Sequence, residues 1–285
     1  MAHITIPEAE ALLDQEIKVL DKGFVRLVDY LGGDARIVQA ARVSYGAGTK
    51  TVREDRALIH YLMRHRHTSP FEQVILTFHV KLPIFVARQW IRHRTARLNE
   101  MSGRYSVMKD EFYLPDPEQI RPQSKTNKQG RDADALDAEQ ARRVLEILTS
   151  AQETAYAGYR EMIDLDIARE LARVNLPLSL YTEWYWQIDL HNLFHFIQLR
   201  ADEHAQYEIR VYAEVLGDCA RAVAPLAYEA FEEYVRHARQ FSREEMEALR
   251  AMLAGQPCPI EQGRRRVEFF QKLGLDDPAL QPQEA

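Results

Sequence analysis

Cysteine is scarce in this chain of 285 residues, and the scarcity excludes several kinds of protein. Only Cys219 and Cys258 are present, the first inside a predicted helix and the second between two prolines. Two cysteines cannot supply a disulfide framework or a cysteine-rich metal site. This low thiol content is typical of a protein from a reducing compartment, and we expect a cytoplasmic location.

Long apolar runs and a surplus of positive charge are also missing. No run of eighteen apolar residues occurs, and the N-terminus lacks the basic-then-apolar order of a secretory signal, so no membrane segment is expected. The formal net charge is −6, which argues against general nucleic-acid binding, because a polyanion is bound through an excess of Lys and Arg. The sequence contains neither a GxGxxG turn nor a P-loop.

The remaining composition is that of an ordinary globular protein, with 46% hydrophobic and 28% charged residues. Period-two alternation predicts strands at 74–81 and 179–188, and a further β-rich stretch lies at 17–32. Helical spacing predicts the remaining elements. These helices are expected at 35–45, 54–67, 84–94, 135–163, 167–176, 190–200 and 203–223.

Several residues have predicted places on these elements. Asp34 and Asp189 stand at the expected N-cap positions of helices 35–45 and 190–200. Arg88 and Arg92 are four apart and are predicted to share a face of helix 84–94. The inner face of helix 54–67 is predicted to carry Leu58, Tyr61, Leu62 and His65. The core side of strand 179–188 is predicted to carry Leu180, Thr182, Trp184, Trp186 and Ile188, and Tyr185 is also expected in the sheet core.

The chain length favours one elaborated domain over two independent ones. We assign residues 1–17 to an N-terminal extension, 18–238 to the domain and 239–285 to a C-terminal tail. Within the domain, residues 109–133 are polar and lack periodicity, which predicts a surface excursion. Arg264–Arg266 are expected to be solvated in the tail.

Five arginines lie between residues 88 and 104 beside a single acid, Glu100, which is unusual in an acidic chain. Guanidinium groups bind phosphate oxygens through paired charge-assisted hydrogen bonds, so a phosphorylated small ligand is expected. A solvated charged face is one alternative. Another is a nucleic-acid-binding module in which Trp90 and Tyr105 stack on bases. The cluster comprises Arg88, Arg92, Arg94, Arg97 and Arg104.

Within this cluster Arg92-His93-Arg94 is followed, after seven residues, by Ser102. This spacing resembles the R-H-R-x7-S signature of flavin-dependent thymidylate synthases. Further segments similar to that family occur in its order: RHRHTSPFEQ, LTFHVKLPIFVARQW, EFYLP, LPLSLYTEWYW and LRADEHAQYEIR. The resemblance spans about residues 21–235.

The resemblance implies the reductive methylation of dUMP to dTMP. In that family 5,10-methylenetetrahydrofolate gives the carbon, FAD carries the hydride and NADPH is the reductant. The implied fold is α+β, a single domain with a central, mainly antiparallel sheet packed by helices. The implied assembly is a homotetramer with active sites at the subunit interfaces, and the implied partners are small molecules rather than nucleic acid or a membrane.

By position, the resemblance assigns two sets of ligands. The residues expected to hold FAD are Ser69, Arg92, His93, Arg94, Glu100, Asp189, Leu190, His191 and His195. Those expected to hold dUMP, in part from a neighbouring chain, are Gln89, Trp90, Ile91, Arg92, Glu100, Met101, Ser102, Gly103, Arg104, Arg173 and Arg200. His67 stands where the family has a histidine on the flavin or folate side.

Catalysis requires a nucleophilic C5 on uracil, and the other class of thymidylate synthase obtains it by adding a cysteine thiolate to C6. Neither cysteine lies in the motif, so the activation is expected to be electrostatic. We predict that Arg200, oriented by Asp202, stabilises the developing uracil anion. Ser102 and His67 complete the predicted catalytic set, with Ser102 as a phosphate ligand rather than a nucleophile.

No metal is expected. His191 and His195 are four apart, like paired metal ligands, but residue 192 is Asn where the zinc motif HExxH has Glu. A last alternative is an inactive family member that serves as a scaffold. The presence of Ser102, Arg104 and Arg200 argues against it.

Overall fold

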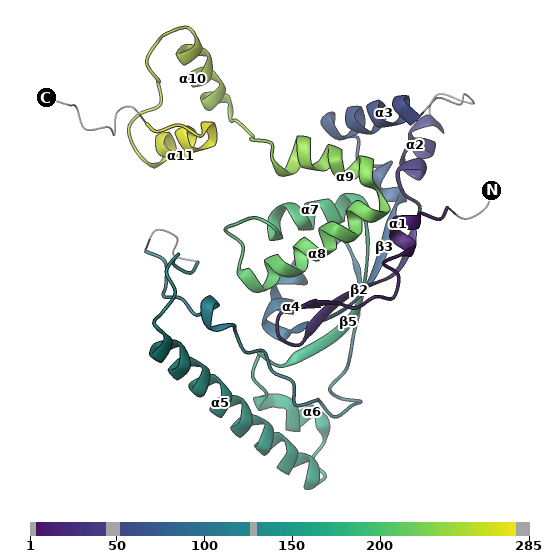
Figure 1. Cartoon of the computed structure of the whole chain (residues 1–285), viewed down its shortest axis with the longest axis vertical. Coiled ribbons are helices and arrows are strands. Elements are labelled where there is room, and N and C mark those ends of the chain that lie inside the picture. Colours follow the sequence, from purple (N-terminus) through teal and green to yellow (C-terminus); the bar gives the residue numbers. More distant parts are fainter. Residues whose placement is uncertain (1–3, 44–51, 126–129, 278–285) are drawn as a thin grey trace, which may run out of the picture. The chain divides into compact units, whose positions relative to one another are not determined.

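The computed structural model describes residues 4–43, 52–125 and 130–277 of the chain (Figure 1). It divides the chain into two compact units, residues 1–231 and 232–285, which are described separately below. The first unit contains the sheet and every predicted site residue. Within the described ranges, no helix is both long and apolar enough to span a bilayer.

A five-stranded sheet forms the centre of the first unit, in the order β1-β2-β3-β5-β4. All neighbouring strands are antiparallel, which confirms the predicted α+β class with its antiparallel sheet. The long pairing of β3 with β5 runs from Ile75 opposite Asp189 to Pro83 opposite Tyr181. The strands are β1 (Ile17–Val19), β2 (Gly23–Leu31), β3 (Ile75–Pro83), β4 (Arg97–Glu100) and β5 (Tyr181–Asp189).

One face of this sheet is covered by helices and forms the core. Leu76, Phe78, Val80 and Leu82 of β3 are fully buried, and the predicted inner residues of β5 are buried as well. The covering helices are α4 (Ile84–Trp90), α7 (Leu190–Arg200) and α8 (Tyr207–Val223), and α7 packs along α8 (Figure 1). Tyr185 is 46% exposed and stacks on His79, because adjacent residues of a strand face opposite sides. Its predicted place in the core is therefore wrong.

The helix predicted at 84–94 ends at Trp90, and the sequence then forms a turn and a strand. Ile91 is the C-cap of α4, so Arg92 lies beyond the helix and does not share a helical face with Arg88. Residues 97–100 form the edge strand β4, with Leu98 opposite Trp186 and Glu100 opposite Trp184. All four residues of β4 are exposed, and this lack of alternation explains why the strand is not predicted.

Two short helices precede β3: α2 (Asp34–Arg42) and α3 (Val52–Arg64). The predicted N-cap role of Asp34 is wrong. Its carboxylate accepts the backbone N–H groups of Leu226 and Ala227, at 2.8 and 2.9 Å, in the first turn of α9 (Pro225–Phe231). His65 follows α3, and its exposed ring contacts the ring of Tyr61 instead of packing into the core. Residues 44 and 45 of the predicted helix 35–45 lie outside the described residues.

The segment 109–133 leads into the long helix α5 (Ala138–Asp164). Phe112, Tyr113 and Ile120 anchor it, since each is at most 7% exposed. Met108 and Phe112 join Tyr159 of α5 in a small hydrophobic cluster. After α5 the chain forms α6 (Arg169–Ala172) and a 3₁₀ turn (Arg173–Asn175) before β5. Other short elements are α1 (Pro7–Glu10), η2 (Phe71–Gln73) and η3 (Pro117–Gln119).

The second unit begins with a π-helical turn, Glu232–Arg236, and contains α10 (Arg243–Leu253) and α11 (Arg264–Leu273). Its core consists of Ala248, Ile260, Phe269 and Phe270. The expectation that Arg264–Arg266 are solvated is wrong for Arg266, whose side chain is 13% exposed. Its guanidinium binds both carboxylate oxygens of Asp277 and the carbonyl oxygens of Cys258 and Ile260.

Candidate functional site

Arg200 is the last residue of α7, and the segment around the end of α4 holds its side chain. Asp189 caps α7 as predicted, because its carboxylate accepts the N–H of Asn192 at 3.0 Å. At the far end of the helix, Nε of Arg200 donates to Nε2 of His93 at 3.0 Å. Its Nη2 donates to the carbonyl oxygen of Gln89 at 3.5 Å. We call Gln89, His93 and Arg200 the Arg200 group.

The imidazole of His93 is neutral in this arrangement. Because its Nε2 accepts from a guanidinium, the ring proton lies on Nδ1. Burial, the charge of Arg200 and the neighbouring His195 lower the pKa of His93 from 6.5 to about 4. Burial and the nearby Arg92 also lower the pKa of Arg200, which nevertheless stays protonated. A charged guanidinium therefore rests on a neutral acceptor and keeps N–H groups for a ligand.

The groups that orient Arg200 differ from the predicted one. Asp202 was expected to orient it, but Asp202 accepts the backbone N–H and Nδ1 of His204, both at 2.9 Å, in the turn after α7. The orienting contacts on Arg200 come from His93 and Gln89. Both lie more than 100 residues away in the chain, a distance at which sequence spacing is not informative.

Four of the five clustered arginines, one in α4 and three after it, carry uncompensated charge among the described residues. Arg88, Arg92, Arg94 and Arg97 form no ion pair with any carboxylate of the described residues, whereas Arg104 pairs with Glu170 at 3.0 Å. An exposed group of unpaired guanidinium groups attracts anions. The sequence expectation of a solvated face explains the exposure of these residues, but it does not explain the Arg200 group beside them.

The segment Glu100–Arg104, which we call the serine loop, continues from the edge strand β4. Thr182 donates its hydroxyl to Oε1 of Glu100 at 2.7 Å, and the N–H of Met101 donates to the carbonyl of Glu183 at 2.9 Å. Both bonds tie the start of the loop to β5. The Ser102 hydroxyl accepts the N–H of Arg104 at 3.3 Å.

Gly103 brings the serine loop against Arg173. A Cβ at position 103 would lie 3.0 Å from Sδ of Met108 and 3.1 Å from Cδ of Arg173, which is closer than side chains normally approach. Only glycine therefore fits here without a shift. The structure thus brings together Ser102, Gly103, Arg104 and Arg173, four of the residues predicted to hold dUMP.

Two predicted ligand residues have no side-chain surface to offer. Trp90 is fully buried, with its ring against Trp184, Trp186 and Phe196. Leu190 is also fully buried, at the start of α7. Neither side chain can reach a ligand, because each is a core residue under the sheet. Trp90 and Leu190 can therefore contact a ligand only through their backbone, whereas the side chain of Ile91, at 41% exposure, is accessible.

The predicted flavin residues are spread over three segments. His195 is exposed on α7, with its ring 5.9 Å from that of His93. His67 lies in the loop after α3, and its ring stacks on that of Tyr61 with 6.0 Å between the ring centroids. Ser69, in the same loop, lines a cavity of about 390 Å³ together with Arg36 and Gln73. The carboxylate of Asp189 is engaged as the N-cap of α7.

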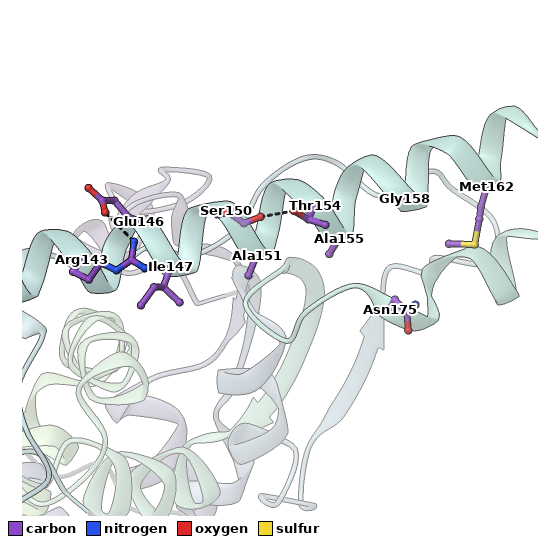
Figure 2. Close-up of a pocket in the computed structure, with 10 residues that line it drawn as sticks. All are labelled: Arg143, Glu146, Ile147, Ser150, Ala151, Thr154, Ala155, Gly158, Met162 and Asn175. Atoms are coloured by element: carbon purple, nitrogen blue, oxygen red, sulfur yellow. Dashed lines mark hydrogen bonds and ion pairs between the residues drawn. The ribbon is translucent and has the colours of Figure 1, made fainter.

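A separate surface groove of about 670 Å³ runs along α5, from Arg143 to Met162, and is closed by Asn175 (Figure 2). None of the predicted site residues lines it. The two charged residues that line it, Arg143 and Glu146, form an ion pair with each other, with 3.3 Å between Nη1 and Oε2. The groove therefore offers no arrangement of acids, bases or nucleophiles for chemistry.

Sequence reasoning missed two residues beside the Arg200 group. Gln206 is hydrogen-bonded to the side chain of Gln89, and Glu208, in the first turn of α8, is 1% exposed and bound to Gln206. Both belong to the segment LRADEHAQYEIR, which carries the family resemblance. The sequence signal for Glu208 was its place beside the apolar face of a predicted helix, because a charged residue that is buried there needs polar partners.

An antiparallel sheet beside a cation-rich turn, with a Ser-Gly loop at its edge, is an arrangement suited to a phosphorylated small molecule. Residues 26–226 match the family model described as thymidylate synthase complementing protein, and residues 240–279 match that of the ThyX C-terminal domain. The chain belongs to the family of flavin-dependent thymidylate synthases.

Individual relatives agree with this membership. The chain is 62% identical, over 261 residues, to a flavin-dependent thymidylate synthase of Treponema denticola, covering 92% of this chain and 98% of the relative. It is 54% identical, over 271 residues, to one of Rickettsia bellii, covering 91% and 92%. Among solved structures, the UMP/dUMP methylase PolB from Streptomyces cacaoi bound with 5-Br dUMP has a TM-score of 0.70 and 34% identity, covering 77% of this chain and 99% of PolB.

Neither thiol is suited to nucleophilic catalysis. Cys219 is fully buried in α8, and burial followed by the charge of Asp218 raises its pKa to about 12. Cys258 lies in the second unit and packs against its hydrophobic core. A thiolate is the reactive form of cysteine, so these positions agree with the predicted electrostatic activation.

Proposed function

We propose that the Arg200 group and the serine loop form the dUMP site of this enzyme, whose reaction is the reductive methylation of dUMP to dTMP. The observation that carries the proposal is the charged guanidinium of Arg200, held by Nε2 of His93 and the carbonyl of Gln89. Membership in the family gives the reaction. The geometry supports the roles of the individual residues.

Arg200 is the group suited to activating the uracil. C5 becomes nucleophilic when the uracil ring carries negative charge that is delocalised over C5 and the carbonyl oxygens, and a fixed guanidinium stabilises that charge as it develops on the oxygens. Its position is set before substrate arrives, because two of its N–H groups are already hydrogen-bonded. Three of its five N–H donors remain for the base.

The serine loop is suited to the phosphate. Backbone N–H groups near Gly103, the hydroxyl of Ser102 and the guanidinium groups of Arg104 and Arg173 are all donors to phosphate oxygens. Arg104 now pairs with an exposed acid, Glu170. An exposed ion pair of this kind is weak, so a phosphate can displace or share it. Glu100 is held by Thr182 and sets the entry to the loop.

The residues present also fit FAD. The unpaired guanidinium groups of Arg92 and Arg94 suit its diphosphate, and the neutral His93 and exposed His195 suit its ring system. Ser69, Glu100, Asp189, His191 and the backbone of Leu190 complete the proposed set. Bound FAD supplies the hydride that completes the methyl group, with NADPH as the reductant and methylenetetrahydrofolate as the carbon donor. We place His67 on the folate side.

A homotetramer with sites between subunits remains part of the proposal. The edge strand β4 is exposed along its whole length, directly before the serine loop. Large apolar side chains are also exposed on and after α5. Exposed apolar surface and a free strand edge are typical of subunit contacts. The exposed residues include Ile147, Leu165, Leu171 and Val174. Because this reaction makes a DNA precursor, we keep the cytoplasm as the proposed location.

The decisive assay is dTMP formation from dUMP, methylenetetrahydrofolate and NADPH, with and without added FAD. We expect a yellow protein, or one that becomes yellow with FAD, and dTMP only when the flavin is bound. A colourless protein that binds DNA with steep salt dependence would instead support the nucleic-acid-binding module. Flavin and dUMP binding without dTMP formation would support the inactive scaffold.

A further inference from the structure

A chain of hydrogen bonds connects the buried start of α8 with the Arg200 group. Glu208 is 1% exposed, and its carboxylate accepts the Tyr113 hydroxyl at 3.0 Å, Nε2 of Gln206 at 2.8 Å and a guanidinium N–H of Arg131. Gln206 in turn accepts Nε2 of Gln89 on its side-chain oxygen. The backbone carbonyl of Gln89 is the contact that accepts from Arg200.

The charge of Glu208 decides which way both amides point. Burial alone would raise the pKa of Glu208, but the hydrogen bond and charge of Arg131, with the bond from Gln206, outweigh it and lower the pKa. An ionised carboxylate only accepts hydrogen bonds. Gln206 must therefore turn its NH₂ towards Glu208 and its oxygen towards Gln89. Gln89 must then turn its own NH₂ towards Gln206, which leaves its carbonyl oxygen on the opposite side of the amide.

We propose that Glu208 is a positioning residue that makes the side chain of Gln89 a fixed hydrogen-bond acceptor in the nucleotide site. Gln89 then accepts from an N–H or O–H group of the bound nucleotide and disfavours a ligand with an acceptor at that place. This inference rests on the proposed function, because it takes Gln89 as part of the dUMP site. To that function it adds a physical reason why the enzyme selects dUMP over other nucleotides.

dUMP carries two kinds of donor that fit this acceptor: the N3–H of uracil and the 3′-hydroxyl of its deoxyribose. Its phosphate carries only acceptors at neutral pH. In dCMP the N3 position is an acceptor, which would face the oxygen of Gln89 without a shared proton. Sites that leave a buried polar group unmatched reject such a ligand strongly. Arg200 supports the same choice, because its N–H groups suit the carbonyl oxygens of uracil.

The test measures dissociation constants of dUMP, dCMP and 2′,3′-dideoxyuridine monophosphate for the FAD-loaded full-length enzyme. Glu208→Gln keeps the shape but can donate or accept, so both amides are free to reverse. Gln206→Leu removes the middle of the chain at an exposed position, which provides the test even if Glu208→Gln fails to fold. Tyr113→Phe is the matched control, since it removes another buried hydrogen bond to Glu208 and leaves the ion pair with Arg131 that keeps the carboxylate ionised.

We expect the preference for dUMP over dCMP to fall about tenfold in both Glu208→Gln and Gln206→Leu, which is the size of the net contribution of one hydrogen bond. The fall should come mainly from tighter binding of dCMP, a gain that structural damage would not produce. If the 3′-hydroxyl of the deoxyribose is the donor, the preference for dUMP over the dideoxy analogue falls instead. In both cases Tyr113→Phe keeps the wild-type ratios.

Unchanged ratios in both Glu208→Gln and Gln206→Leu, with dUMP still bound, would overturn the proposed positioning role of Glu208 without contradicting the proposed dUMP site. A change of the same size in Tyr113→Phe would also overturn it, because loss of any buried hydrogen bond to Glu208 would then be the cause. Failure of the wild-type enzyme to bind dUMP would overturn both the positioning role of Glu208 and the proposed function.

Discussion

Replacing Arg200 by alanine should remove the activation of uracil while the flavin stays bound. Two of the five N–H groups of Arg200 are used by His93 and Gln89, so up to three face the ligand. Losing one preorganised donor to a developing anion lowers the rate about 10²-fold to 10³-fold, and we expect a loss of at least about 10³-fold for the whole guanidinium. Arg200→Lys keeps the charge but not the planar fork, so we expect an intermediate loss.

The assay for this prediction is tritium release from dUMP labelled at C5, at saturating FAD and folate. Visible absorbance of the purified variants reports whether FAD is retained. Arg160→Ala is a matched control, since Arg160 is a half-exposed arginine of α5 with a long contact to Asp164 at 3.9 Å. Tritium release at the wild-type rate by Arg200→Ala, with FAD and dUMP both bound, would refute the activating role.

Three further predictions concern the surroundings of the site. Gly103→Ala should weaken dUMP binding about tenfold, measured by calorimetry, because the new methyl group presses on the buried Met108 and displaces the exposed Arg173; unchanged affinity would contradict the role of the loop. Asp34→Ala should lower the free energy of unfolding by about 1–2 kcal/mol in urea titrations, since two N–H groups lose their acceptor; an unchanged midpoint would contradict the cap. His93 has its pKa lowered from 6.5 to about 4, so the unfolded chain binds more protons between these values and stability should fall as the pH falls through that window. His93→Gln should lack this part of the pH dependence, and an identical slope would count against the neutral imidazole.

The strands and helices that bury one face are the parts of the fold that the sequence predicts. β3 and β5 alternate because the helices cover only one side of the sheet, and the inner residues of β5 are buried as expected. β4 is missed because an edge strand with both sides exposed shows no alternation. Asp34 is misassigned because a helix start and a cap for a distant helix look alike in the sequence.

In the second unit, the helix α10 is also missed, although its capping box, Ser242 with Glu245, can be read directly from the sequence. Its apolar face is narrow, because the unit has a core of only a few residues. Arg266 is also misjudged as solvated. A run of three arginines gives no sign that one of them is enclosed by carbonyl groups.

For the site, charge is the informative signal. The excess of arginines in one segment of an acidic chain, together with the family motif, is enough to indicate the serine loop and Arg200 from the amino-acid sequence alone. The contacts that hold Arg200 could not be predicted, because His93 and Gln89 are distant in sequence and bind it through hydrogen bonds that leave no periodic pattern. The buried Glu208 is similar, since its partners Tyr113 and Arg131 lie in the polar segment 109–133.

The most direct measurement of the central claim is a crystal structure of the enzyme with FAD and dUMP bound. The account predicts the uracil within hydrogen-bonding distance of Arg200, the phosphate on Ser102 and Arg104, and no covalent bond to protein. A nucleotide bound far from both Arg200 and Ser102, or a bond between Cys219 and C6 of the base, would contradict it.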